Sequence, residues 1–319
     1  MNGIFEQKIP LVSVLIPTYN RPAYFEEALI SVLKQTYPNI EIIIGDDSTD
    51  DRTEALIRDK YMHYSNISYI RNPRTLGQFE NSINLINKAN GEFINFLMDD
   101  DLFFSQKIEK MMRFFLNDLN KEIVLVTSFR KLIDGEGNYL PDGEINKKLY
   151  DSDVIVSGKE VGNQILMDTF NYVGEPTTVL FRKYALSEPF GTLANRRYLC
   201  SVDLASWLEL LSKGKMVYLS EPLSCFRLHP TQKYRDFSML ANGIEDLVHL
   251  VSTAKQYGFL ETKDKEETAL RTVLNWISAA IPHYQVRNSI EYAKKMLQYQ
   301  QTIQSKLDIL NKIKGELNE

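Results

Sequence analysis

Cysteine is scarce in this chain, because Cys200 and Cys225 are the only two among its 319 residues. Two cysteines cannot supply the disulfide framework of a small secreted domain. Such residues are more often small buried side chains than a redox pair. We therefore expect a protein of a reducing compartment, and a cytoplasmic one.

Long apolar runs and a surplus of basic residues are absent too. No apolar run reaches the roughly 18 residues that favour a membrane-spanning helix. Met1–Lys8 includes an acid, and the apolar run after it ends at Pro17, so we expect no signal peptide. The formal net charge is −5, whereas proteins that bind nucleic acid normally carry a basic surplus. We expect no nucleic-acid partner.

Three phosphate-binding signatures are missing as well. The chain contains neither Gly-x-Gly-x-x-Gly nor Gly-x-x-x-x-Gly-Lys, which argues against dinucleotide-binding enzymes and P-loop proteins. The first apolar run leads into Pro17–Asn20, where an aspartyl-phosphate enzyme would need acidic residues.

Short apolar stretches and helical patterns alternate through the first part of the chain. The predicted strands are Leu11–Ile16, Ile40–Gly45, Ile67–Ile70 and Phe93–Met98, and the predicted helices cover Phe25–Leu33, a segment from about Arg52, and Phe79–Gly91. Such alternation predicts a mostly parallel sheet with helices on its faces.

The later part of the chain ends in a predicted helical tail. Before the tail we expect strands at Ile123–Thr127, Val179–Phe181 and Met216–Leu219, and helices at Ile108–Leu119 and Ser201–Lys213. Beyond about Gln232 apolar residues recur at helical spacing, among them Ile290, Ala293, Leu297, Ile303, Leu307, Leu310 and Ile313. Three roles are open for this tail: packing on the core, pairing with a second copy as a homodimer, or peripheral association with the inner face of a membrane.

Acidic residues follow two of the predicted strands. Asp46-Asp47-Ser48 follows the second strand, and Asp99-Asp100-Asp101 follows the fourth. Ligands of such sheets bind outside the carboxyl ends of the strands, so both clusters would lie at the ligand edge. Adjacent carboxylates repel each other, and Mg²⁺ or Mn²⁺ bound to oxygen ligands would offset that repulsion. Taken alone, each cluster is more often a solvated turn or a helix cap.

Three further side chains have chemistry that suits a site. Asp203 lies in the first turn of a predicted helix, beside its buried stripe, where a carboxylate is either stabilised by the helix dipole or available for proton transfer. Arg227 suits phosphate oxygens. His229 is a candidate ligand, although a lone histidine in a loop is more often a surface residue.

The order of these motifs resembles the inverting family 2 glycosyltransferases of the GT-A fold. The resemblance is carried by Val12–Arg21 (VSVLIPTYNR), Ser31–Tyr37, Ile42–Asp50 and Gly91–Asp101, and more weakly by Gly174–Phe181, Asp203 and Glu221–His229. It implies an α/β, Rossmann-like fold with a mostly parallel central sheet flanked by helices, and a C-terminal helical extension. It also implies that residues 1–101 form the nucleotide-sugar-binding half, 102–232 the acceptor-binding half and 233–319 the extension.

The resemblance assigns roles to individual residues. It implies a nucleotide-sugar site made by Pro17, Thr18, Tyr19, Asn20, Asp47, Arg71, Asp99, Asp100 and Arg227, with Tyr19 stacking on the base and Asp47 binding the base or ribose. The implied metal ligands are Asp100, Asp101 and His229, and the implied catalytic base is Asp203. Many members have an aspartate where Met98 stands here, so Asp100 is the metal ligand that the pattern defines best. Glu175 and Arg196-Arg197 are candidates for the acceptor region.

The resemblance thus predicts a hexosyl- or N-acetylhexosaminyl-transferase that uses Mn²⁺ or Mg²⁺. Its donor would be a nucleoside-diphosphate sugar, by default a UDP-sugar with a dTDP-sugar still open, and its acceptor a hydroxyl of a glycan, a lipid-linked glycan or a glycoprotein. Two alternatives come from other classes: a metal-dependent nucleotidyl transferase or phosphohydrolase, and a binding module that keeps the nucleotide-sugar pocket without turnover.

Overall fold

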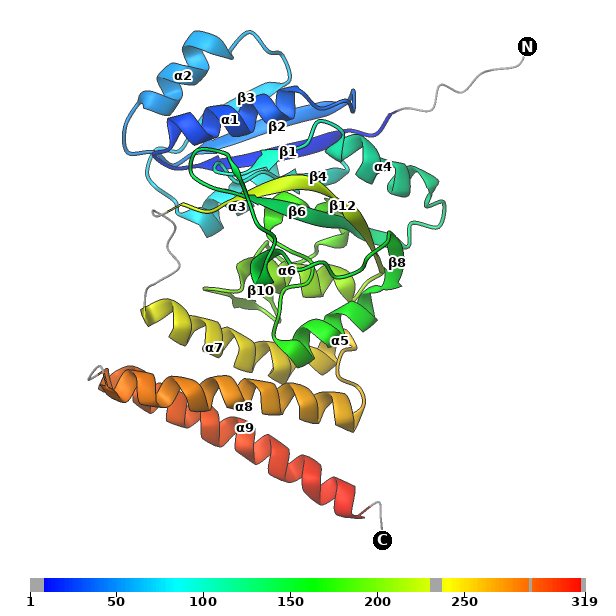
Figure 1. Ribbon diagram of the computed structural model, residues 1–319, viewed down its shortest axis with the longest axis vertical. Helices are drawn as coiled ribbons and strands as arrows, with labels where there is room; N and C mark the ends of the chain where they lie inside the picture. The colour runs from blue at the N-terminus through cyan, green and yellow to red at the C-terminus, as the bar shows by residue number, and fades with distance from the viewer. Residues whose placement is uncertain (1–8, 230–236, 287–288, 317–319) are drawn as a thin grey trace. The chain divides into compact units, whose positions relative to one another are not determined.

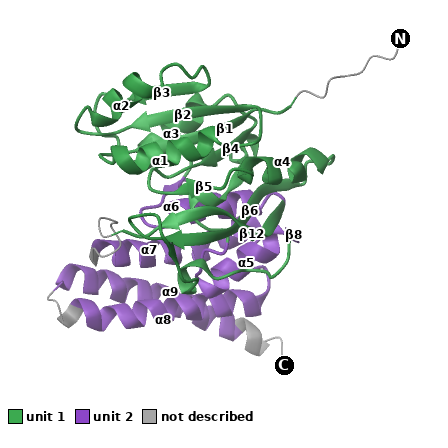
Figure 2. Ribbon diagram, turned by 45° about the horizontal axis from the view of Figure 1, so that its top comes forward, with its two compact units in different colours: residues 1–155, 173–190, 215–230 green, residues 156–172, 191–214, 231–319 purple. Residues whose placement is uncertain are grey.

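The computed structural model describes residues 9–229, 237–286 and 289–316. Met1–Lys8 and the expected boundary between residues 232 and 233 lie outside this part of the chain. The protein divides into two compact units (Figure 2): one of Met1–Ile155, Val173–Phe190 and Lys215–Pro230, and one of Val156–Tyr172, Gly191–Gly214 and Thr231–Glu319. This division does not follow the order of the chain, and the three-part functional division expected from the sequence stays a prediction.

The first unit is built on a long mixed sheet. Its strands lie in the order β3 (Ile67–Arg71), β2 (Ile40–Asp46), β1 (Val12–Thr18), β4 (Phe93–Phe96), β9 (Leu180–Arg182), β6 (Ile123–Ile133), β12 (Lys215–Arg227) and β5 (Leu102–Phe103). The short β7 (Tyr139–Leu140) pairs with the end of β6, and β8 (Val154–Ser157) crosses the boundary between the units.

Six strands of this sheet run in the same direction. β3, β2, β1 and β4 pair in parallel, and so do β6 and β12. β9 lies antiparallel to both β4 and β6 and joins these two parallel blocks, while β5 runs antiparallel to β12. The predicted mostly parallel α/β sheet is therefore confirmed, and the carboxyl ends of six strands meet at one edge.

Helices cover both faces of this sheet (Figure 1). The buried side chains of α1 (Pro22–Leu33), α2 (Arg52–Lys60) and α4 (Lys107–Asn117) share one hydrophobic core with Val12, Val14 and Ile16 of β1. α3 (Gln78–Lys88) lies against β1 and β2 from the other face. The predicted apolar stripe of α1 is buried, because Phe25, Ala28, Leu29 and Val32 all face the core.

The strands β6 and β12 are longer than the sequence predicts. Ile123–Thr127 and Met216–Leu219 are confirmed as strands, but their pairing continues to Ile133 and Arg227. The register of β12 shifts on both sides of Pro222, as expected where a proline interrupts the ladder. The pairing resumes after this irregularity, so Arg227 belongs to the strand and not to a loop.

The second unit is mainly helical. It contains α5 (Gly158–Asp168), the β10–β11 hairpin (Thr192–Leu193, Arg196–Arg197), α6 (Val202–Leu211), α7 (Phe237–Thr253), α8 (Lys263–Val286) and α9 (Ile290–Glu316). The predicted stripe of α6 is confirmed, since Leu204, Trp207, Leu208 and Leu211 are buried. In α9, Ala293, Ile303, Leu307 and Leu310 are buried, Ile290 and Leu297 are exposed, and the side chain of Ile313 lies outside the described part. Within the described ranges no helix combines the length and apolarity needed to cross a membrane.

The close approach of β2 and α3 depends on a glycine at the end of β2. A Cβ atom on Gly45 would lie 2.3 Å from Oδ1 of Asn81. Asn81 cannot easily move away, because it is buried and its Nδ2 donates to the Gly45 carbonyl at 2.8 Å while its Oδ1 accepts from Asn72 at 3.0 Å. Replacement of Gly45 therefore forces a shift beside the acidic cluster that follows it.

We expect Gly45→Ala to lower the free energy of unfolding by about 1–3 kcal/mol, the usual cost of overpacking. Chemical denaturation followed by circular dichroism measures this change. Gly143→Ala is the matched control, because a Cβ at Gly143 meets no atom within 4 Å. Equal stability of the two variants would contradict the packing role of Gly45.

Candidate active site

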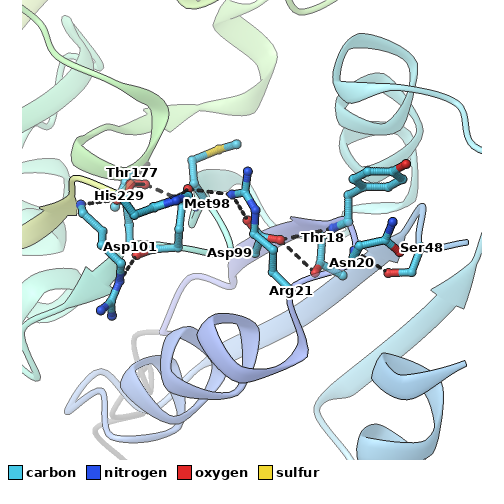
Figure 3. Close-up of polar contacts among 12 residues, drawn as sticks. Thr18, Asn20, Arg21, Ser48, Met98, Asp99, Asp101, Thr177 and His229 are labelled. Carbon is cyan, nitrogen blue, oxygen red and sulfur yellow. Dashed lines mark hydrogen bonds and ion pairs between the residues drawn. The ribbon is translucent and has the colours of Figure 1, made fainter. Parts of the chain in front are cut away.

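The carboxyl edge of the sheet gathers side chains from the ends of several strands (Figure 3). Thr18 ends β1 and is followed by Tyr19–Arg21, and Asp46 ends β2 and is followed by Asp47 and Ser48. Asp99–Asp101 comes shortly after β4, and His229 comes two residues after the end of β12. The expectation that the two acidic clusters lie at the same edge is met, since β1, β2 and β4 are parallel neighbours.

Arg21 lies against the second acidic cluster. Its Nη1 is 2.7 Å from Oδ2 of Asp100 and 3.3 Å from Oδ1 of Asp99. The two carboxylates are mostly buried, with side chains 12% and 8% exposed, whereas Arg21 remains 31% exposed. One guanidinium thus offsets the negative charge of two neighbouring carboxylates. It does so at a place that solvent still reaches.

Asp99 is also held by the end of β1. Its Oδ2 accepts hydrogen bonds from the Thr18 hydroxyl at 2.9 Å and from the Tyr19 amide at 3.1 Å. Burial and then the charge of Asp100 raise the pKa of Asp99 to about 6, although Arg21 and these two hydrogen bonds oppose the rise. Asp99 therefore carries a proton for part of the time near neutral pH.

Asp100 meets an imidazole as well as Arg21. Nε2 of His229 is 3.0 Å from Oδ2 of Asp100, the same oxygen that Arg21 contacts. The His229 ring is buried and lies 5.2 Å, between centroids, from the ring of Tyr24 on α1. The structure thus brings together two of the three predicted metal ligands.

Asp101 is fully buried and its two oxygens face protein donors. Oδ2 accepts from the Thr177 hydroxyl at 2.5 Å, and Oδ1 accepts from the Arg227 amide at 3.0 Å. Burial, Asp100 and Glu175 raise the pKa of Asp101 well above its usual range. Asp101 thus ties β4 to η2 (Pro176–Thr178) and β12, and its metal role stays a prediction.

The side chain of Arg227, the last residue of β12, has no exposed surface. Its Nε donates to the Asp100 carbonyl at 2.7 Å, and its Nη2 is 2.6 Å from Oε2 of Glu27. Nη1 donates to the carbonyls of Asp134 and Gly135, at 3.3 and 3.2 Å. Since these partners surround the guanidinium, its geometry gives no support to a direct phosphate contact, which stays a prediction.

Asp47 fixes the loop that follows β3. Its Oδ1 accepts from Nδ2 of Asn72 at 2.8 Å and from the Leu76 amide at 3.1 Å, while Oδ2 accepts from the Gly77 amide at 2.8 Å. Arg71, at the end of β3, is half-buried and pairs with Glu54 at 2.7 Å. Nucleotide contacts by Asp47 and Arg71 stay predictions.

The end of β1 and the two residues after it include the side chains predicted to contact the base. Pro17 and Thr18 are buried, and Tyr19 leaves 46% of its surface exposed beside them. Asn20 has a left-handed backbone, with φ of +55°, and its amide donates to the Ser48 hydroxyl at 2.9 Å. An exposed aromatic ring on a rigid loop suits stacking, and that role of Tyr19 stays a prediction.

Asp203 belongs to the second unit, where it lies in the first turn of α6. Its Oδ1 accepts from the Leu204 amide at 2.8 Å, and its Oδ2 accepts from Nδ2 of Asn171 at 3.0 Å. Its side chain is half-buried. Glu175 of the first unit pairs with Arg130 at 2.7 Å, and burial raises its pKa.

Asp100 and His229 fit a divalent cation that takes most of its ligands from elsewhere. Among the residues that the structure describes, no three His, Cys, Asp or Glu side chains converge as a metal site. Mg²⁺ commonly uses one or two carboxylates together with substrate phosphates, and Mn²⁺ also prefers oxygen ligands, so Asp100 is the better match of the two residues. The donor set therefore suits a cation that arrives with a diphosphate.

A hollow of about 580 Å³ lies elsewhere on the first unit. Ile123 and Lys215, the first residues of β6 and β12, line it, so it lies at the amino ends of these strands. Its charges are paired, as in Lys110–Glu221 and Lys215–Glu122. Because it lies away from the carboxyl edge where the acidic clusters gather, we assign it no role in the site.

Two residues of the edge received no role from the sequence. Arg21 belongs to the motif Val12–Arg21. Its position just after β1 could have indicated a role, because β1 pairs with β4, the strand that precedes Asp99–Asp101. Thr177 gave no comparable signal, because it reaches Asp101 and the Met98 amide from η2, far away in the chain.

The family of the chain follows from comparison with known proteins. The family model described as glycosyl transferase family 2 matches residues 13–186. The chain belongs to this family. This match includes the ends of β1, β2 and β4 and the three consecutive aspartates, so the predicted family is confirmed.

Relatives and solved structures agree with this assignment. An uncharacterized glycosyltransferase of Rickettsia typhi is 30% identical over 268 residues, which are 81% of this chain and 74% of that protein. A Campylobacter jejuni protein named GalNAc(5)-diNAcBac-PP-undecaprenol beta-1,3-glucosyltransferase is 33% identical over 106 residues, 33% of this chain and 34% of its own. S. aureus TarS 1-349 in complex with UDP-GlcNAc superposes with a TM-score of 0.55 and 16% identity, covering 92% of this chain and 90% of that one. The predicted GT-A fold is confirmed.

The raised pKa of Asp99 predicts how Asp99→Asn changes the pH dependence of stability. The usual aspartate pKa is 3.8, so between pH 4 and 6 the folded protein keeps a proton that the unfolded chain has released. The wild-type contribution of Asp99 to stability is therefore lost as pH rises through this window. The substituted asparagine cannot titrate, so we expect the variant to gain roughly 2 kcal/mol relative to wild type between pH 4 and 7.

Chemical denaturation of the metal-free protein at several pH values tests this. Asp51→Asn, which changes an exposed carboxylate before α2, is the control and should follow the wild-type curve. If the curve of Asp99→Asn also runs parallel to wild type, Asp99 is ionised throughout the range and the prediction is wrong.

Proposed function

We propose that this family 2 glycosyltransferase moves a sugar from a UDP-sugar to an acceptor hydroxyl by a single inverting displacement. The observation that carries the proposal is the shared contact at Oδ2 of Asp100, where Arg21 and His229 converge at the carboxyl edge. This edge concentrates negative charge and positive partners where a sheet of this kind binds its ligand.

The donor class is inferred from the wall of the site and from the relatives. Tyr19 offers an exposed ring for a base, and its neighbours Thr18 and Asn20 contact Asp99 and Ser48, one beside each acidic cluster. A structural neighbour is described in complex with UDP-GlcNAc, and a relative is named a glucosyltransferase. A UDP-linked hexose or N-acetylhexosamine is the donor that these observations favour, and a hydroxyl of a glycan or lipid-linked glycan is the proposed acceptor.

Asp100 and His229 would hold a divalent cation together with the diphosphate of the donor. When bound, such an ion supplies a Lewis acid that offsets the charge growing on the leaving diphosphate. Arg21 contacts Oδ2 of Asp100 and offsets its negative charge in the free protein. Since Arg21 is partly exposed, it can turn toward a phosphate while it leaves Asp100 to the cation.

Asp203 is the proposed base. A sugar hydroxyl is too weakly acidic to ionise first near neutral pH, so a carboxylate must accept its proton as the new bond forms. Asp203 keeps a fixed direction through its bonds from Leu204 and Asn171. Attack by the hydroxyl as the diphosphate leaves requires no covalent intermediate, so no serine or cysteine nucleophile is needed.

Binding of metal and nucleotide should be interdependent. We expect Mn²⁺ to tighten UDP binding by about 10-fold or more in the wild-type protein, because the protein alone offers too few ligands for the ion. Asp100→Asn should abolish this effect while metal-free UDP binding stays measurable. Isothermal titration of UDP with and without Mn²⁺ tests this, with Asp51→Asn as the control. An unchanged effect of Mn²⁺ in Asp100→Asn would remove Asp100 from the metal site.

Loss of the base should slow turnover without weakening the donor. We expect Asp203→Asn to reduce the rate of UDP release from UDP-GlcNAc, with water as the acceptor, by roughly 100- to 10,000-fold at unchanged UDP affinity. A variant that keeps a tenth of the wild-type rate would exclude Asp203 as the base. The same assay separates the alternatives, because a nucleotidyl transferase would exchange pyrophosphate and a binding module would release nothing.

A further inference from the structure

The start of α6 is held by a residue of α7. The N-cap of α6, Ser201, makes no hydrogen bond with its side chain to the helix. The amides of Leu199, Cys200 and Ser201 instead donate to a single oxygen, Oδ2 of Asp246, at 3.1, 2.8 and 2.9 Å. A carboxylate that accepts several backbone N–H groups is a strong, charge-assisted anchor.

The other oxygen of Asp246 faces a positive charge. Asp246 is fully buried, and Nη2 of Arg196 lies 3.2 Å from its Oδ1. Arg196 comes from β11 and lies over the ring of Tyr198 at 5.0 Å. A buried carboxylate is costly unless its charge is paired, and here the Arg196 charge faces Oδ1, which accepts no hydrogen bond from the described residues. The three amide bonds to Oδ2 and this ion pair together hold the carboxylate between the hairpin and the start of α6.

The anchored segment ends two residues before Asp203. Asp203 is the second residue of α6, so its direction depends on how the first turn starts. Its own carboxylate bonds from Leu204 and Asn171 hold only if this turn is correctly placed. Misplacement of a reacting group by about 1 Å is enough to cost roughly 100-fold in rate.

We propose that Asp246 is a positioning residue for Asp203. It holds the segment Leu199–Ser201 and thereby fixes the first turn of α6 in the orientation that proton transfer requires. This inference rests on the proposed function of Asp203 as the base. It gives α7, which lies beyond the residues that match the family model, a part in the reaction.

The first test removes the anchor and measures turnover separately from donor binding. We expect Asp246→Ala to lower kcat for UDP release from UDP-GlcNAc by about 10- to 100-fold, with KM and UDP affinity unchanged. Asp246→Asn keeps one acceptor oxygen and should recover part of this loss. Glu245→Gln is the matched control: Glu245 also pairs with Arg196, at 3.1 Å, and belongs to the same helix. It should keep the wild-type kcat.

The second test asks whether Asp246 acts through Asp203. If it does, adding Asp246→Ala to Asp203→Asn should slow the reaction no further, because the positioned group is already lost. Hydrogen exchange at the amides of residues 199–201 should become at least about 10-fold faster in Asp246→Ala, because the bonds that protect these amides are gone.

The outcomes separate this proposal from the proposed function. Equal losses of kcat from Asp246→Ala in the wild-type and Asp203→Asn backgrounds would overturn the positioning role and leave the base assignment intact. Unchanged exchange at residues 199–201 would also overturn it. A fully active Asp203→Asn, or no UDP release by the wild-type protein, would refute the proposed base or donor, and the positioning role would fall with it.

Discussion

Three adjacent carboxylates at the end of a buried strand can coexist only if each is compensated in its own way. Asp99 meets a hydroxyl, an amide and Arg21, and its pKa is raised. Asp100 shares one oxygen between Arg21 and His229. Asp101 is enclosed by protein donors. Their partners come from the ends of β1 and β12 and from η2. Among the partners of the three carboxylates, the partly exposed Arg21 beside Asp100 is the one that a bound ligand would most readily displace.

Local patterns predicted the part of the fold that is decided locally. Apolar runs such as Leu11–Ile16 are strands because both faces of β1 are covered, and the acids after β2 and β4 meet because these strands are parallel to β1. The reversed direction of β9 was beyond the sequence, since a three-residue strand gives no sign of its partners. The strand predicted at Met216–Leu219 continues as far as Arg227, because the pairing resumes after the irregularity at Pro222.

In the site too, some features could be predicted from local sequence and others depend on distant parts of the chain. The family motif predicted which side chains gather at the edge, but not that Arg21 would reach two of the acids or that Arg227 would be enclosed below them. Those outcomes depend on pairings between distant segments, as Arg227 with Glu27 shows. Asp246 is the extreme case, because the whole of α6 and β12 and the first half of α7 separate it from its three amide partners in the chain. Its sequence neighbours carry no local signal, and only the tertiary structure reveals its use.

The discontinuity of the first unit bears on how the protein folds during synthesis. Its last segment, Lys215–Pro230, supplies β12, the amide that binds Asp101 and the imidazole that meets Asp100. Pairings over such long sequence separations form late. A nascent chain that has emerged only as far as β9 therefore holds its aspartates beside an unfinished sheet edge. The partners that β12 and His229 give to Asp101 and Asp100 can therefore be made only after the chain beyond α6 has been synthesised.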